Sequence, residues 1–327
     1  MRALLLLFIS IVLSVRASGA PAVTSVSPTS VSPIWEITGA GFGVKSPAAP
    51  LVWADFENGL EPSALGLKRK WDTVQSLTTA AEGPDGSRCA KASDGSGKWT
   101  LMVSYDSWTR EGQAFYVYKK LRLNFKITDP SQNWKIWRMW PAHFGYPNIY
   151  AAENNGRVYV EGVDGESGFW GRMGEPTTDW RTEEIIGRAS SRIGAKDGPL
   201  EFRRDGKKLC AGTILTRTKQ SQQLMTQNFV VHGVLANASQ WHPEWSDNNR
   251  LWADDVYVDT TWARVIVGDA PKIEACRRFA IQIPTAWSDT RAQFHSRFNG
   301  FDAGEQVYLY LYNAAGECNA DGFPVRR

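Results

Sequence analysis

The sequence predicts an all-β protein, and three observations carry that prediction. Residues 119–128 alternate strictly in polarity, with Leu121 and Leu123 on one face, which is the period of a half-buried strand. Residues 200–209 carry a central Asp-Gly pair, the typical dipeptide of a tight type I′ hairpin turn. No amphipathic helix of useful length appears, while 29 glycines and 16 prolines interrupt the chain at short intervals.

Three further segments have the composition and alternation of strands, namely 133–140, 157–163 and 250–258. The first carries aromatic residues on both faces: Arg138 and Trp140 share one side, and Trp137 lies on the other. In the second, Val158 and Val160 are expected to point inward, which leaves the side chains of Tyr159 and Glu161 on the outer face.

Residues 1–20 have the pattern of a secretory signal peptide: Arg2 precedes a short apolar run, and small residues follow it. The apolar run is shorter than the roughly 20 residues that cross a membrane comfortably. We therefore expect an exported protein, extracellular or periplasmic, with no membrane span after signal cleavage. An uncleaved membrane anchor is the alternative interpretation.

The charge balance and the tryptophan content point to a class of partner. The chain has 37 basic and 34 acidic residues, and the balance falls close to zero without Arg2 and Arg16. This argues against nucleic acid as the main partner. The 15 tryptophans are far more than usual for this length, and an exposed indole stacks well on the apolar face of a sugar ring. A polysaccharide or glycan is the expected partner, although at least half of the tryptophans are expected to be core residues.

Four cysteines, Cys89, Cys210, Cys276 and Cys318, are present, and no Cys-x-x-Cys pair occurs. An even number of cysteines in an exported chain favours two disulfides. Three pairings are compatible with the sequence at this point.

Residues 37–43, "ITGAGFG", lie in a segment (21–45) that resembles the first strands of the IPT/TIG immunoglobulin-like domain. The closing strands of that family resemble two later stretches, around Trp287-Ser288-Asp289-Thr290 and from Asn319 to Phe323. The resemblance implies a discontinuous immunoglobulin-like sandwich made of residues 21–48 and 272–327. Insertion of a second domain at a surface loop is physically easy when its two ends lie close together.

The intervening residues 49–271 resemble the concanavalin-A-like jelly roll, on the stretches "LVWADFENG", "GPLEFRRDGKKL" and "RLWADDVYVD" taken in that order. The two resemblances together imply a jelly-roll β-sandwich inserted into a small immunoglobulin-like β-sandwich. They also imply disulfides within each domain, which pair Cys89 with Cys210 and Cys276 with Cys318.

Concanavalin-A-like folds bind or cleave polysaccharides on a concave sheet face, and the hydrolases among them need carboxylates facing one another. Here Glu161 and Asp164 are three residues apart, and Glu166 is five from Glu161, so odd spacing turns them to opposite faces. The hydrolase signature is absent. The adjacent acidic pairs Glu183-Glu184 and Asp254-Asp255 are interpreted as solvated charges at the rim.

The predicted function is non-catalytic recognition of a polysaccharide on a concave, aromatic-rich sheet face. Aromatic stacking and hydrogen bonds would supply the affinity. The candidate ligand-binding residues are Trp137, Arg138, Trp140, Tyr150, Tyr159, Glu161 and Trp170.

Two other classes stay open. A polysaccharide lyase that eliminates across a uronate would use a cation to neutralise the carboxylate and a Tyr or His to move the proton, and Arg138, His143 and Tyr150 are the candidates. A structural matrix protein with no sugar site is the third class. The oxygen-rich loop 242–249 offers ligands that a structural Ca²⁺ would take, but it lacks the spacing of a calcium-binding loop. The spacing favours a plain surface loop, so no metal or cofactor is expected.

Overall fold

The computed structural model of this chain describes residues 19–75, 77–92, 100–104, 112–126, 134–140, 149–154, 157–172, 178–218, 228–233 and 250–327. Almost all regular structure in these ranges is β, which confirms the predicted fold class. Most of the predicted signal peptide, His143 and the whole loop 242–249 lie outside the described residues. No helix in the described part of the chain is long and apolar enough to cross a membrane.

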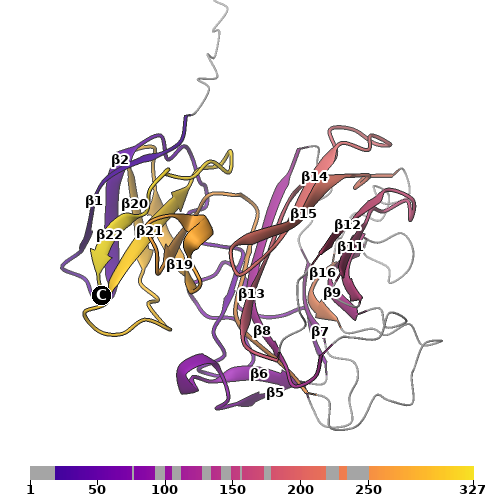
Figure 1. The fold of residues 1–327 in the computed structure, drawn as a ribbon, viewed down its shortest axis with the longest axis horizontal. Coiled ribbons are helices and arrows are strands. Elements are labelled where there is room, and N and C mark those ends of the chain that lie inside the picture. Colours follow the sequence, from indigo (N-terminus) through magenta and orange to yellow (C-terminus); the bar gives the residue numbers. More distant parts are fainter. Residues whose placement is uncertain are drawn as a thin grey trace, which may run out of the picture.

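The middle of the chain forms two sheets packed face to face (Figure 1). The first, called the site sheet here, has the order β12, β11, β10, β9, β16, β7, β4, with the bounds Gly168–Arg172, Arg157–Glu161, Ile149–Asn154, Trp134–Trp140, Asn228–Gly233, Thr100–Ser104 and Thr73–Gln75. All its neighbouring strands run antiparallel.

The second sheet, called the junction sheet, has the order β15, β14, β13, β8, β17, β6, β5. The short strand β3 is an additional member, which pairs with β17. Its strands span Lys207–Ile214, Gly198–Arg204, Arg181–Arg188, Ala114–Leu123, Leu251–Asp259, Cys89–Ala92, Leu77–Ala80 and Val52–Ala54. The predicted hairpin is confirmed: Asp205 (φ 48°) and Gly206 (φ 71°) form a two-residue turn with both φ values positive, as a type I′ turn requires.

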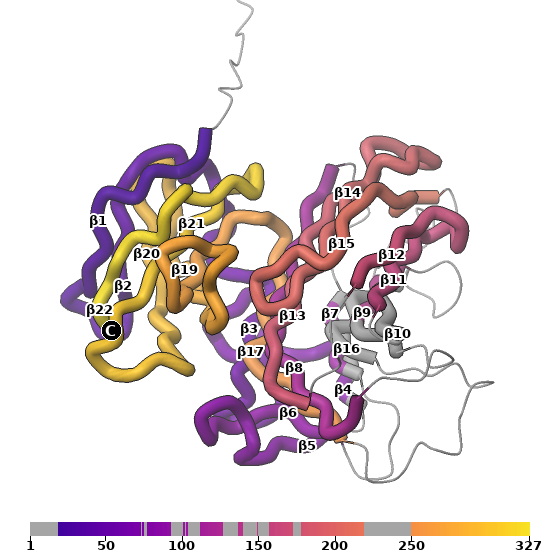
Figure 2. Tube along the Cα trace, viewed as in Figure 1, coloured from indigo at the N-terminus to yellow at the C-terminus, as the bar shows by residue number. Residues whose placement is uncertain are grey.

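The two ends of the chain build a third sheet, called the terminal unit, in the order β1, β2, β20, β19, β18, β21, β22 (Figure 2). Its strands span Ala22–Pro28, Ile34–Ala40, Arg291–His295, Phe279–Trp287, Arg264–Gly268, Gln306–Tyr312 and Phe323–Arg326. The strand of the "ITGAGFG" segment, β2, thus pairs with β20 more than 200 residues later, with Ile37 opposite Ala292.

The terminal unit also contains a strand that lies before the predicted boundary at residue 272. β18 (Arg264–Gly268) pairs with β19 and β21, so it belongs with the end segments and not with the inserted residues. The sequence gives no sign of this boundary, because β17 and β18 are both buried runs joined by the short connection 260–263. Two short 3₁₀ turns, η1 (Pro84–Gly86) and η4 (Ile273–Ala275), complete the described elements.

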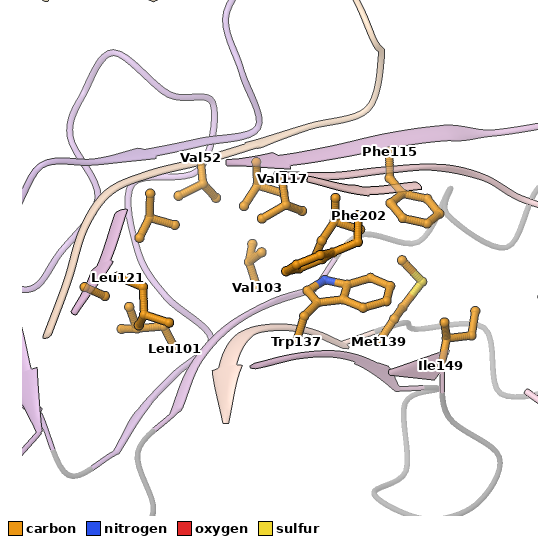
Figure 3. Packing of buried hydrophobic residues seen from close by; sticks show 14 of the residues in the cluster. Val52, Leu101, Val103, Phe115, Val117, Leu121, Trp137, Met139, Ile149 and Phe202 are labelled. Atoms are coloured by element: carbon orange, nitrogen blue, oxygen red, sulfur yellow. The ribbon is translucent and has the colours of Figure 1, made fainter. Parts of the chain in front are cut away.

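The main hydrophobic core lies between the site sheet and the junction sheet (Figure 3). Val117 and Leu121 point into it from β8, and Leu101 points into it from β7. Trp137 lies in the middle of this core, fully buried, with its ring stacked on Phe115 at a centroid distance of 5.8 Å. The prediction that Trp137 contacts a ligand is therefore wrong: strand alternation turns its side chain inward, away from the face that carries Arg138.

The predicted disulfides are also wrong, because all four cysteines are free thiols. Cys210 lies on β15 at one edge of the junction sheet and Cys89 lies on β6, five strands away, or about 24 Å at the usual strand spacing. A disulfide requires Cα atoms within about 7 Å. The Cys276 thiol instead contacts the carbonyls of Ala270 and Lys272, and the Cys318 thiol contacts Oδ1 of Asn319 at 3.6 Å.

The adjacent acidic pairs are buried, and the interpretation of them as solvated rim charges is wrong. Glu183 is 1% exposed and receives ion pairs from Lys119, Arg181 and Arg204. Burial opposes ionisation of Glu183, but these cations outweigh it and hold the pKa of the carboxyl well below its usual range.

In the other acidic pair, Asp254 and Asp255, the pKa of one carboxyl is raised and not lowered. Asp255 forms an ion pair with Lys120, with Nζ 2.8 Å from Oδ2. Burial and the neighbouring charge of Asp255 raise the pKa of Asp254 well above its usual range.

We expect Trp137→Ala to lower the free energy of unfolding by about 3–5 kcal/mol, because it removes a fully buried indole from the core. Trp170→Ala is the matched control, and since that side chain is 56% exposed we expect a loss of about 1 kcal/mol or less. Guanidinium unfolding followed by far-ultraviolet circular dichroism measures both. Equal losses in the two variants would contradict the assignment of Trp137 to the core.

Candidate functional site

The candidate site lies on the outer face of the site sheet, at its β9 to β12 end. On β11, Val158 and Val160 are buried in the core, so the side chains of Arg157, Tyr159 and Glu161 lie on the opposite face. This agrees with the sequence prediction for the strand. The buried side chains of Trp137 and Met139 on β9 likewise place Arg138 on the outer face.

The strand register brings several predicted site residues into one row across the sheet. The backbone of Tyr150 pairs with Arg138 on one side and with Glu161 on the other, and Glu161 pairs with Gly168 on β12. The next row pairs Tyr159 with Trp170. We call the outer surface formed by Arg138, Tyr159, Glu161 and Trp170 the Arg138 face.

Tyr159 and Trp170 form an aromatic pair on this face. Their ring centroids are 4.6 Å apart with a tilt of 34°, and the Trp170 side chain is 56% exposed. A bare backbone at Gly168 lets the Tyr159 ring lie flat here, because a Cβ at that position would stand 2.7 Å from the Tyr159 hydroxyl. The pair offers an apolar surface with a polar rim, which suits one face of a sugar ring.

The Tyr159 hydroxyl donates a hydrogen bond to the Glu161 carboxylate, two residues along the same strand. Partial burial, the charge of Glu161 and this hydrogen bond all raise the pKa of Tyr159. The hydroxyl therefore keeps its proton at neutral pH and acts as a donor. A tyrosine that works as a general base needs the opposite shift in pKa.

The turn between β11 and β12 fixes the register of the Arg138 face. The Asp164 carboxylate accepts hydrogen bonds from the backbone N–H and the hydroxyl of Ser167 at 2.9 Å and 2.6 Å, and lies 2.9 Å from Nζ of Lys196. Burial works against the charged form of Asp164, but the bonds from Ser167 and Lys196 outweigh it and lower its pKa to about 2. Asp164 thus has a structural role in the turn.

The structure adds two residues that the sequence did not single out, Gly168 and Arg172. Arg172 is exposed and pairs with the exposed Arg157, which extends the Arg138 face by a cationic third row. Trp170 and Arg172 are two residues apart on one strand, so their side chains point to the same face of the sheet. This alternation is the sequence signal from which Arg172 could have been predicted.

For three other predicted site residues, the structure describes the backbone alone or nothing. Trp140 and Tyr150 lie in β9 and β10 with only their backbones described, and His143 falls outside the described residues. In the described part of the chain, no group of three His, Cys, Asp or Glu side chains is arranged to hold a metal ion.

Comparisons with known proteins give no family for the chain. No family model and no curated protein matches the sequence. Among solved structures, an endo-β-1,4-glucuronan lyase from the fungus Trichoderma reesei matches with a TM-score of 0.41 and 16% identity over 59% of this chain and 92% of its own. A marine alginate lyase from Aplysia kurodai matches with a TM-score of 0.43 and 9% identity, over 58% of this chain and 92% of its own.

The binding domain of Paraclostridial Mosquitocidal Protein 1 covers more of the chain, 85% against 73% of its own, with a TM-score of 0.43 and 7% identity. Similarity at this level says nothing about the activity of the chain.

We expect Glu161→Gln to lower the pKa of Tyr159, because the substitution removes the negative charge that opposes formation of tyrosinate. A pH titration of ¹³C-labelled tyrosine by NMR measures this, with the resonance assigned by Tyr159→Phe. Glu166→Gln is the control, since Glu166 lies in the same turn, is 81% exposed and does not act on Tyr159. An unchanged or higher pKa in Glu161→Gln would show that the two side chains do not interact.

Proposed function

We propose that the protein is exported and recognises a polysaccharide or glycan on the Arg138 face. The Tyr159–Trp170 pair, with its exposed indole, carries the proposal, because it places a stacking surface on the same side of one sheet as a cation and a carboxylate. The Trp170 ring packs on the apolar face of a sugar ring, while Arg138 and Glu161 serve sugar oxygens and hydroxyls as donor and acceptor.

Two groups on this face, Tyr159 and Asp164, are held in states that suit recognition better than catalysis. Tyr159 has a raised pKa and is held as a donor by Glu161, which is the wrong state for a base that removes a proton. Asp164 is taken up by the turn, so it does not complete a carboxylate pair with Glu161.

Affinity electrophoresis on gels containing a panel of neutral and acidic polysaccharides tests the proposal. We expect at least one polymer to retard the protein, and we expect Trp170→Ala to weaken that retardation roughly tenfold, equivalent to about 1.4 kcal/mol. Leu67→Ala is the control, because Leu67 is a similarly exposed apolar side chain in a loop before β4. Failure of every polymer to retard the protein would refute the proposal.

A lyase is the second candidate, and one observation favours it: the backbones of Arg138, Tyr150 and Glu161 share a single row across the sheet. Arg138 would neutralise the uronate carboxylate, and Tyr150 would move the proton. Incubation with uronate polymers would then raise absorbance near about 235 nm, where the unsaturated product absorbs, and Tyr150→Phe would abolish the rise. No absorbance change with any uronate polymer would eliminate this candidate.

A further inference from the structure

A groove runs between the junction sheet and the terminal unit, on the opposite side of the sandwich from the Arg138 face. Two cavities of about 690 Å³ and about 190 Å³ adjoin there. They share the lining residues Pro84, Asp85, Arg278, Asn299 and Gly300. One wall is η1, the purple coil beside β6 in Figure 1, and the other is the yellow loop that follows β20 in the terminal unit. We call this the junction groove.

The wall on the terminal unit is held in one geometry by Arg278. Its guanidinium donates to the carbonyl of Gly300 at 2.9 Å, lies 3.4 Å from a carboxylate oxygen of Asp269, and pairs with Glu305. Glu305 in turn accepts the backbone N–H of Asp302 at 2.8 Å. A wall fixed in this way loses little conformational entropy when a ligand binds.

The loop after β20 is also tied to the inserted part of the chain by ion pairs. Nη1 of Arg297, from the terminal unit, lies 2.8 Å from Oδ2 of Asp55, and its Nη2 lies 3.5 Å from Oδ1 of Asp255 in the junction sheet. Lys120, which lines the smaller cavity, pairs with the same Asp255. The loop after β20 is therefore held against the junction sheet by charged side chains and not only by its chain connections.

The smaller cavity has an excess of cations. Its charged lining residues are Lys120, Arg181, Arg277 and Arg278 against Asp85 and Asp205. Asp269 accepts the backbone N–H of Arg277 at 2.8 Å, which fixes the backbone of Arg277 at this wall. The Arg277 side chain is exposed and has no ion pair within the described ranges. Its guanidinium is thus a cation at the groove that is available to a carboxylate.

An uncharged amide and a carboxylate acceptor line the same groove. The Asn299 amide lines both cavities, and Trp180 lines the smaller one. Asp85 adopts a left-handed backbone conformation (φ 55°), and its carboxylate faces Gly300 across the groove: a Cβ on Gly300 would lie 3.5 Å from Oδ2 of Asp85. Asp85 can accept ligand hydroxyls, but it repels a ligand that carries only carboxylates.

We propose that the junction groove binds an acidic oligosaccharide, a short chain that bears both carboxylates and hydroxyls. Arg277 pairs with a sugar carboxylate, Asp85 accepts sugar hydroxyls, and the Asn299 amide donates to ring or hydroxyl oxygens. An acidic peptide fits less well, because it lacks hydroxyls for Asp85 and places further negative charge beside it. The combined volume is in the range of natural ligand sites. This binding does not depend on the Arg138 face.

Isothermal titration calorimetry of the full chain with a tetrasaccharide of galacturonate tests the proposal. We expect Arg277→Gln to weaken binding roughly tenfold, because the substitution removes a charge-assisted pair. Arg192→Gln is the matched control: Arg192 is an exposed arginine beyond the far end of β13, more than about 20 Å along the strand from Arg181, and we expect no change.

Trp170→Ala separates this site from the Arg138 face, and binding of the tetrasaccharide should persist in that variant. The proposal is overturned if the tetrasaccharide does not bind the wild type, or if it binds Arg277→Gln as tightly as the wild type. It is likewise overturned if Trp170→Ala loses tetrasaccharide binding while Arg277→Gln retains it. It is also overturned if a neutral glucose tetrasaccharide or a tetraglutamate peptide binds as tightly as the galacturonate tetrasaccharide.

Discussion

The arrangement of the whole molecule depends on one buried arginine at the junction of its two parts. The Arg264 guanidinium, from the terminal unit, lies between the rings of Tyr312 and Tyr116, 3.6 Å and 4.3 Å from their centroids. Glu184 of the junction sheet lies 3.6 Å from it and accepts the Tyr116 hydroxyl at 2.6 Å. A buried cation of this kind is tolerated only with its partners in place, so the contact fixes how the terminal unit sits on the junction sheet.

This constraint decides which surfaces can meet a ligand. Around Arg264, an aromatic cluster that includes Trp53, Tyr118 and Tyr310 fills the contact between the junction sheet and the terminal unit. Trp262 adds a hydrogen bond from its indole to the carbonyl of Gly187 at 2.8 Å. The outer face of the junction sheet is thereby covered over its centre. The outer face of the site sheet, which carries the Arg138 face, and the junction groove at the margin of the contact stay accessible to ligands.

Much of the architecture could be predicted from the sequence, since it follows from period-two alternation and turn chemistry. The Asp205-Gly206 hairpin and the inward valines of β11 follow directly from the residue pattern. Alternation also placed Trp137 opposite Arg138, yet it could not say which face was buried, because both faces of β9 carry aromatic residues. Only packing against Phe115 on the facing sheet settles that Trp137 is a core residue.

The remaining features depend on partners that are distant in sequence. Glu183 looks like a surface charge until Lys119 and Arg204, which the strand pairing brings beside it, are known. The cysteine count favoured disulfides, but the order of strands separates Cys89 from Cys210 by most of the junction sheet. The junction groove combines η1 with a loop more than 200 residues later, which no local pattern can indicate.

We propose that a ligand binds on the Arg138 face, where Trp170 is exposed, while Trp137 on β9 points into the core. The most direct measurement is a titration of the ¹⁵N-labelled tryptophan indoles by NMR with an oligosaccharide of the polymer that binds best. The account predicts that the indole resonance of Trp170 shifts at the lowest ligand concentrations while that of Trp137 does not move. A titration in which Trp170 stays unchanged while other tryptophans respond would contradict it.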